Sequence, residues 1–311
     1  MPDQPAGDEV RPPWFADRSV LVLMYRVNRR PRPQGNLFAE QPQSFLDHLE
    51  QCLLFGAEMI TSGRGHERHW KLGNRDIGLD PPYIAGWIGF RAQDAEERDD
   101  YDDATVAWRT EVVATERRAT APFVVAGGTR LLLIAKHPQF PEGTLPVVFE
   151  ALLNQGEEDR PHPTTDWAVE PVLDSGDFQE WLRQTPVVEQ VTFTVKRPNP
   201  DASESFAQLD QHLNAMRIGE LTHRMSPSDK EHGLAKDFDQ DPISQGLMEM
   251  ARQSFARIVA KGKGVTGSIR SYDQRERVRR EYLPMPSEHD DAFRTLVRYA
   301  ITKALEEPTD A

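Results

Sequence analysis

The sequence contains a single cysteine, Cys52, among its 311 residues. One cysteine excludes an intramolecular disulfide, and such scarcity is typical of proteins from a reducing compartment. The longest apolar runs, at 20–24 and 131–135, are far too short to span a bilayer. The first residues are rich in acids and prolines, unlike a secretory signal. We therefore expect a cytoplasmic protein with no membrane partner.

Short motifs of nucleophilic catalysis and nucleotide binding are also missing. No Gly-x-Ser-x-Gly elbow occurs, and the glycines at 262, 264 and 267 match neither the phosphate-loop nor the dinucleotide-binding signature. Cys52 shares a helical spacing with Phe45, Leu49 and Leu53, which predicts a core residue rather than a nucleophile. We therefore expect no cofactor and favour a protein that is not an enzyme.

Lysine is scarce too, with 8 residues against 29 arginines, and acids outnumber bases so that the formal net charge is −13. The sign of the charge nevertheless reverses near the end of the chain. Residues 252–280, called the basic window below, carry nine bases against Asp273 and Glu276, for a net charge of +7. Because like charges repel, such a concentration is typical of a solvated face or of a site for an anionic partner.

The basic window is the strongest candidate for a binding site. If residues 275–282 form a strand, Arg275, Arg277 and Arg279 point to one side about 7 Å apart, a spacing that suits a phosphate backbone. Lysines lie on a glycine-rich turn, and Tyr272 and Tyr282 are able to stack on bases. The residues predicted to bind nucleic acid are Lys261, Lys263, Arg270, Arg275, Arg277, Arg279 and Arg280.

Two other interpretations of the basic window stay open. The simplest is that its arginines pair with the protein's own 50 acidic residues, or protect an exposed edge strand from aggregation. The other is that they dock on an acidic protein partner. DNA or RNA and an acidic protein are therefore the two candidate partners.

One segment is an alternative candidate for a metal site. His66 and His69 lie three residues apart, and together with Asp76 they form the ligand set for a metal-dependent nuclease or hydrolase. Flanking glycines argue against a helix in this segment. We therefore expect a polar loop or an irregular hairpin over 62–82, and no bound metal.

Acidic segments raise a similar question. Asp237, Asp239 and Asp241 resemble the start of a calcium loop, but Pro242 replaces the glycine that such a loop requires. We expect Asp241 to begin a helix as its cap instead. The acidic run at 96–103 is predicted to be a solvated loop, with a divalent-cation site of a nuclease as the alternative.

The predicted elements mix helices and strands without strict alternation. Strands are predicted at 20–27, 83–91, 105–116, 123–135, 167–173, 187–196, 255–261 and 265–273. Helices are predicted at 45–53, 145–155, 175–183, 201–216, from 241 onward, and at 287–306. We therefore expect an α+β fold with mixed, largely antiparallel sheets and packed helices. The strand–helix–strand start of each half suggests two related sandwich-like halves.

Three segments are expected along the chain. Prolines deny residues 1–17 regular hydrogen bonding, so this part is predicted to be a disordered arm. A polar stretch then separates an N-terminal α+β half at 18–156 from a C-terminal α+β half at 157–311. The second half contains the basic hairpin and the terminal helix.

The stretches Tyr83–Phe90, Lys196–Pro200 and Ala256–Gly262 resemble uncharacterised bacterial proteins associated with phage-defence and mobile-element loci. The resemblance implies a prokaryotic cytoplasmic protein and supplies no catalytic residues. Together with the basic window, it predicts a non-enzymatic binding component of a bacterial defence or mobile-element system that engages nucleic acid through its basic C-terminal hairpin. The alternatives are a metal-dependent nuclease or hydrolase, and an interaction subunit that docks on an acidic partner.

Overall fold

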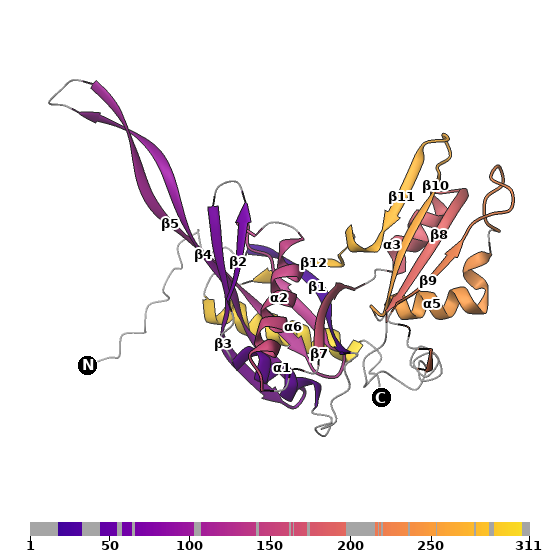
Figure 1. The fold of residues 1–311 in the computed structure, drawn as a ribbon, viewed down its shortest axis with the longest axis horizontal. Coiled ribbons are helices and arrows are strands. Elements are labelled where there is room, and N and C mark those ends of the chain that lie inside the picture. The colour runs from indigo at the N-terminus through magenta and orange to yellow at the C-terminus, as the bar shows by residue number, and fades with distance from the viewer. Residues whose placement is uncertain are drawn as a thin grey trace, which may run out of the picture.

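Two antiparallel β-sheets organise the protein in its computed structural model (Figure 1). The structure describes residues 18–32, 44–54, 58–63, 66–102, 107–140, 143–161, 163, 165–172, 175–196, 215–216, 218, 220–235, 237–252, 254–276, 278–285 and 289–306. The predicted disordered arm at 1–17 lies outside these residues. The predicted helix at 201–216 also lies outside them, apart from its last two positions.

The larger sheet, sheet A, has eight strands in the order β12-β1-β6-β5-β4-β3-β2, with β7 also paired to β1. Its strands are β1 (Arg18–Pro31), β2 (Glu58–Gly63), β3 (His66–Leu79), β4 (Pro82–Asp102), β5 (Ala107–Ala126), β6 (Leu131–Ala135), β7 (Thr165–Pro171) and β12 (Arg280–Met285). All of its pairings are antiparallel. β1 is long enough to pair with β12 along 18–23 and with β7 along 25–31.

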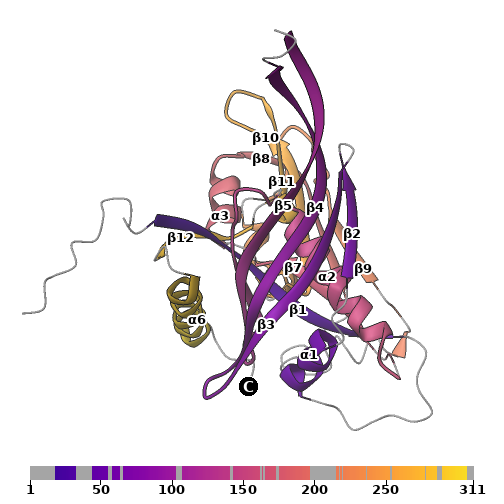
Figure 2. The same cartoon turned by 90° about the vertical axis from the view of Figure 1, so that its left-hand side faces the viewer.

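Helices cover both faces of sheet A (Figure 2). They are α1 (Phe45–Leu54), α2 (Thr144–Glu158) and α6 (His289–Glu306). Successive residues of a strand point to opposite faces, and β6 is buried at all five positions. Leu132 and Ile134 pack toward α1 and α2, whereas Leu131 and Leu133 pack toward α6. The centre of sheet A is therefore apolar on both sides.

The smaller sheet, sheet B, has the strand order β11-β10-β8-β9. Its elements are β8 (Val187–Lys196), β9 (Glu220–Met225), β10 (Ala256–Lys263) and β11 (Ile269–Asp273), with the helices α3 (Ser175–Arg183) and α5 (Pro242–Arg252) and the 3-10 turns η3 (Phe238–Gln240) and η4 (Gln274–Glu276). The predicted alternation of β8 is confirmed, because Val191, Phe193 and Val195 are fully buried in its core. The predicted cap is confirmed as well, because Asp241 Oδ2 accepts the backbone N–H groups of Ile243 and Ser244, at 3.1 Å each.

β4 and β5 continue together far beyond the rest of sheet A (Figure 1). β3 pairs with β4 no further than Ala92, whereas β4 and β5 stay paired as far as Asp102 and Ala107. The prediction of a loop at 96–103 is therefore wrong, since the run lies on β4 as far as Asp102. A two-stranded ribbon makes its backbone hydrogen bonds between strands whatever charge the side chains carry. The side chains of 93–115 lie outside the description.

The predicted α+β class with largely antiparallel sheets is confirmed. The strand predicted at 123–135 is interrupted by a turn at 127–129, so that its first part belongs to β5 and its last part is β6. Sheet A takes β7 and β12 from beyond residue 156, where a boundary between two halves is predicted. Among the helices in the described part of the chain, none is long and apolar enough to cross a membrane.

The packing of α6 gives a direct test of this fold. Leu296 is fully buried between α6 and the strands of sheet A, whereas Arg298 is exposed. Leu296→Ala is expected to lower the free energy of unfolding by about 2 to 5 kcal/mol, because it removes apolar contacts and leaves a cavity. Arg298→Ala is the control and should change it by less than about 0.5 kcal/mol. Two equally mild effects in urea denaturation would mean that α6 does not pack on the sheet.

Candidate functional site

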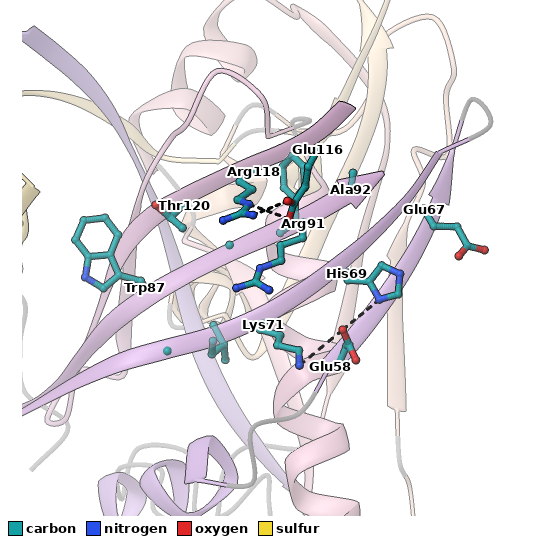
Figure 3. A pocket seen from close by; sticks show the side chains of 14 residues that line it. Glu58, Glu67, His69, Lys71, Trp87, Arg91, Ala92, Glu116, Arg118 and Thr120 are labelled. Carbon is teal, nitrogen blue, oxygen red and sulfur yellow. Dashed lines mark hydrogen bonds and ion pairs between the residues drawn. The ribbon is translucent and has the colours of Figure 1, made fainter. Parts of the chain in front are cut away.

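One part of the α6 face of sheet A is not covered by the helix and is hollowed into a pocket of about 910 Å³. This part, called the open face below, is formed by β2, β3, β4 and β5 (Figure 3). α6 reaches its border at Trp87, whose indole stacks on Phe293 with ring centroids 5.8 Å apart. The titratable side chains that line the open face are Glu58, Glu67, His69, Lys71, Arg91, Glu116 and Arg118.

The register of the strands places three basic side chains in one row across the open face. His69 of β3 is the direct partner of Arg91 in β4, and Arg91 is the direct partner of Arg118 in β5. Direct partners in an antiparallel pair have Cβ atoms about 5 Å apart on the same face. The side chain of Arg91 therefore begins between those of His69 and Arg118 on one face of the sheet.

In the neighbouring row of residues across the open face, the central position has no side chain. Gly89 lies in this row between Lys71 and Thr120. A Cβ at position 89 would come within 2.8 Å of both the carbonyl oxygen of Ala119 and a methyl carbon of Thr120, so the position excludes a side chain. Trp87 lies two residues before Gly89, on the same face of β4. A shallow depression therefore separates the basic row from the indole.

Two glutamates hold cations at the edges of the open face. Glu116 accepts two hydrogen bonds from Arg118, one of them 2.8 Å from Nε, and this lowers the pKa of the Glu116 carboxyl. Glu58 Oε1 lies 3.1 Å from Nδ1 of His69 and 3.8 Å from the ammonium of Lys71. Arg91 lies between these two groups (Figure 3), is exposed, and forms no ion pair with the residues that the structure describes. The centre of the open face therefore presents a guanidinium to solvent.

The basic window is divided between the two sheets. Lys261 and Lys263 lie on β10, Arg270 on β11, Arg275 in η4, Arg279 just before β12, and Arg280 at its first position. Arg277 lies outside the described residues. The assumption that residues 275–282 form one strand is wrong in its first part. Asp273 Oδ1 accepts the backbone N–H of Arg275 at 3.0 Å, and the chain turns there. The structure therefore does not align Arg275 and Arg279 on one strand.

Several bases of the basic window pair with the protein's own acids. Ion pairs and hydrogen bonds join Arg252 to Glu249 at 2.9 Å, Arg257 to Asp273 at 3.0 Å, Lys263 to Glu189 at 3.0 Å and Arg279 to Glu281 at 3.2 Å. Arg270 donates a hydrogen bond to Gln184. Lys261 and Arg275 are exposed and form no ion pair within the described part of the chain. The local-pairing interpretation thus accounts for four of the window's bases.

The two tyrosines of the basic window differ in accessibility. Tyr272 is 1% exposed, and its ring packs on Phe178 with centroids 4.9 Å apart. It therefore cannot stack on a base, because both ring faces lie in the core of sheet B. Tyr282 on β12 is 74% exposed.

His69 and Asp76, two of the three alternative metal ligands, are not brought together. The irregular hairpin predicted over 62–82 agrees with the structure, because β3 pairs antiparallel with β2 and β4 and has a register shift between Gly73 and Asp76. His69 and Asp76 lie on this one strand, seven residues apart, which corresponds to about 23 Å. His69 is held by Glu58, and Asp76 accepts a hydrogen bond from the hydroxyl of Tyr83 at 3.1 Å. The side chain of His66 lies outside the description.

Cys52 is buried as predicted, but it belongs to a polar cluster. Its Sγ donates to Glu157 Oε2 at 3.2 Å, and Nε2 of His48 lies 2.7 Å from the same oxygen. Burial and the neighbouring carboxylate raise the pKa of the Cys52 thiol, which therefore is not an activated nucleophile. Neither His48 nor Glu157 is predicted from the sequence, although the four-residue spacing of His48 and Cys52 on a helix is visible there.

The open face was not predicted from the sequence either. The alternation of Trp87, Gly89 and Arg91 with the buried Ile88 and Phe90 is visible in the sequence as a period of two. The alternation does not show which strands pair with β4 or in which register. A one-residue change of register would turn each of these side chains to the other face.

The chain was compared with known proteins. No curated protein matches the sequence. A protein-family model, described as a domain of unknown function (DUF4747), matches residues 86–298, which is more than half of the chain. The matched region includes β4 from Gly86 onward, all of β5 and the whole of sheet B. The chain therefore belongs to the DUF4747 family.

Proposed function

We propose that this protein is a non-enzymatic binding protein that holds a single strand of nucleic acid on the open face of sheet A. Protein modules that bind single-stranded nucleic acid commonly combine an exposed sheet face, an aromatic ring for base stacking and basic side chains for phosphates. The open face has each of these, with Trp87 at one border and Arg91 and Arg118 in its central row. Guanidinium groups suit phosphate because they donate two parallel hydrogen bonds.

The observation that carries the proposal is the direct pairing of Arg91 with Arg118. Like charges directly opposite each other on neighbouring strands destabilise a sheet. Glu116 forms an ion pair with Arg118, and the charge of Arg91 also lowers the pKa of Glu116, so one carboxylate faces two guanidinium groups. A bound phosphate would supply the negative charge that the two arginines lack, so the pair suits an anion better than it suits the stability of the sheet.

The size of the open face supports a short stretch of a single strand. Its four strands lie about 4.8 Å apart, so the face is about 14 Å wide. Four-stranded sheets of other nucleic-acid-binding modules hold two or three bases. The depression at Gly89 gives the ligand room to approach the backbone of β4. Duplex DNA, by contrast, is usually contacted by elements that enter a groove.

The basic window is the competing location for the same ligand, and the proposal places the strand on the open face instead. Lys261 and Arg275 are its exposed bases without an ion pair in the described part of the chain. The resemblance to proteins of phage-defence and mobile-element loci agrees with nucleic acid as the ligand. A role of this protein in such a system, and its location in the cytoplasm, stay predictions. An acidic protein partner remains the alternative ligand of this window.

Binding to a short labelled oligonucleotide tests the proposal. Binding should weaken with salt by a log–log slope of about −0.7 for each phosphate contact. The double variant Arg91→Ala/Arg118→Ala should bind more weakly and flatten the slope by about 1.4, because two phosphate contacts are lost. Fluorescence anisotropy at several salt concentrations measures both quantities, with single-stranded DNA and RNA as separate ligands.

The matched control is the double variant Lys261→Ala/Arg275→Ala, which removes the same charge from the basic window. It should bind like the unmodified protein. If the control loses binding while the variant of the open face keeps it, the basic window carries the function. If the unmodified protein shows no binding at low salt, nucleic acid is not the ligand of either surface.

The stability of the protein tests the argument about like charges separately. Arg91→Thr should leave the free energy of unfolding unchanged or raise it by up to about 1 kcal/mol, because it removes a repulsive cross-strand pair. The neighbouring Phe90→Ala, on the buried face of β4, should lower it by about 3 to 5 kcal/mol. A marked loss of stability in Arg91→Thr, measured by urea denaturation, would show that Arg91 has a structural role.

A further inference from the structure

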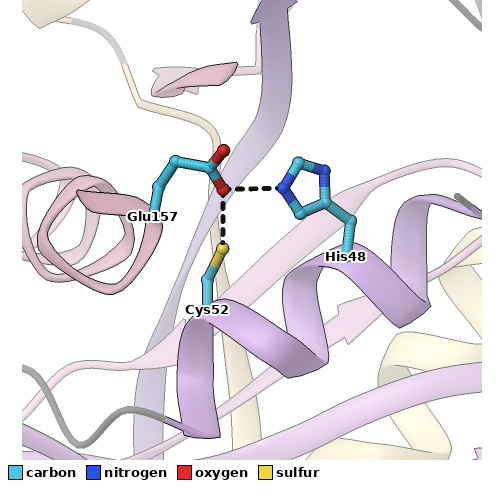
Figure 4. A group of neighbouring side chains, drawn as sticks. All are labelled: His48, Cys52 and Glu157. Atoms are coloured by element: carbon cyan, nitrogen blue, oxygen red, sulfur yellow. Dashed lines mark hydrogen bonds and ion pairs between the residues drawn. The ribbon is translucent and has the colours of Figure 1, made fainter. Parts of the chain in front are cut away.

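Three side chains of the types that ligate metal ions converge in the interior, on the opposite side of sheet A from the open face. They are His48 and Cys52 of α1 and Glu157 of α2 (Figure 4). Their ligand atoms all lie within 4.8 Å of one another, and the residues are 4%, 1% and 0% exposed. His48 and Cys52 are four residues apart on one helix, so they share a face.

The crossing of the two helices is fixed next to this cluster. A Cβ at Gly156 would lie 2.1 Å from the carbonyl oxygen of Cys52, so only glycine allows α2 to approach α1 this closely. The helix predicted at 145–155 is too short, since α2 continues through Gly156 to Glu158. The glycine brings the backbone of α2 against α1 and presents the adjacent Glu157 to His48 and Cys52.

The hydrogen bonds of the cluster conflict at one atom. Nε2 of His48 faces Glu157 Oε2, which accepts hydrogen bonds, and also Nη1 of Arg160, which only donates them. One imidazole nitrogen cannot donate to the first and accept from the second at the same time. Glu157 Oε2 meanwhile receives Cys52 Sγ at 3.2 Å and Arg160 Nη1 at 3.0 Å. Three groups thus point at one buried oxygen.

We propose that His48, Cys52 and Glu157 bind a divalent transition metal ion of the zinc type. An imidazole nitrogen, a thiolate sulfur and a carboxylate oxygen form a ligand set that suits zinc. The ion takes the lone pair of His48 Nε2 and the sulfur of Cys52, whose thiol proton leaves to solvent. The thiolate and the carboxylate together balance its 2+ charge. The proposal does not depend on the nucleic-acid interface.

The surroundings of Glu157 orient it for this role. Its other oxygen, Oε1, accepts the backbone N–H of Thr165 at 3.2 Å and a hydrogen bond from Arg160 at 3.2 Å. Such outer contacts fix the direction of a metal-binding carboxylate. Nη1 of Arg160 lies between Glu157 Oε2 and His48, in space that the ion requires. Metal binding therefore displaces this nitrogen from Oε2, while Oε1 stays available to it.

The test uses the full-length protein and two metals. Elemental analysis of the purified protein should find one zinc ion per chain. Exchange into Co²⁺ should produce a near-ultraviolet absorption band, because cobalt bound to a thiolate gives a sulfur-to-metal charge-transfer transition. Cys52→Ser should abolish this band, since a hydroxyl keeps the shape of the side chain but supplies no thiolate. If the unmodified protein holds no zinc and gives no band with Co²⁺, the proposal is wrong.

Two further variants separate a metal site from a purely structural ion pair. His69→Ala, at the alternative site on β3, should keep the band, and its loss there would overturn the assignment. Arg160→Gln removes the competing cation, so it should bind Co²⁺ at least as tightly as the unmodified protein, and added Zn²⁺ should raise its melting temperature. If Arg160→Gln lowers the melting temperature and Zn²⁺ does not restore it, the cluster is an ion pair that needs its arginine.

Discussion

The structure depends on the requirement that a sheet with two apolar faces be covered on both sides. The five residues of β6 are all buried, which a strand tolerates only between two layers. α1 and α2 supply one layer and α6 supplies the other, from opposite ends of the chain. β12 then completes the edge of β1 close to where α6 begins. Sheet A therefore needs β12 and α6, which come late in the chain, as much as it needs β1 and α1, which come early.

This requirement also explains why the open face exists. α6 is 18 residues long and contacts β5, β6 and β12. The part of the sheet face that it covers therefore extends only to the stacked pair of Trp87 and Phe293. Beyond that border, the same face of β2 to β5 meets solvent and carries Lys71, Arg91 and Arg118 instead of apolar side chains. Directly opposite the pocket, buried residues such as Trp70, Ile88 and Phe90 belong to the core that α1 and α2 cover. One face of a single sheet thus serves stability while the other is free to bind.

Sequence patterns predicted correctly the features that residues close together in the chain determine. The alternation of β8, the bounds of α3 and the cap at Asp241 all follow from neighbouring residues. The long β4–β5 ribbon was missed because its charged residues suggested a loop, whereas its hydrogen bonds depend only on the partner strand. The site was harder still. Arg91 meets Arg118, and Cys52 meets Glu157, only after strand register and helix crossing are set by the whole core.

The most direct measurement is to identify which residues touch a bound strand. An oligonucleotide that carries a photoreactive base can be cross-linked to the protein, and the modified peptide identified by mass spectrometry. The account predicts cross-links on β4 near Trp87 and Arg91, where a base would stack beside the basic row. Cross-links confined to β10 and β11 around Lys261 would contradict the account, because they would place the nucleic acid on the basic window and leave the open face without its ligand.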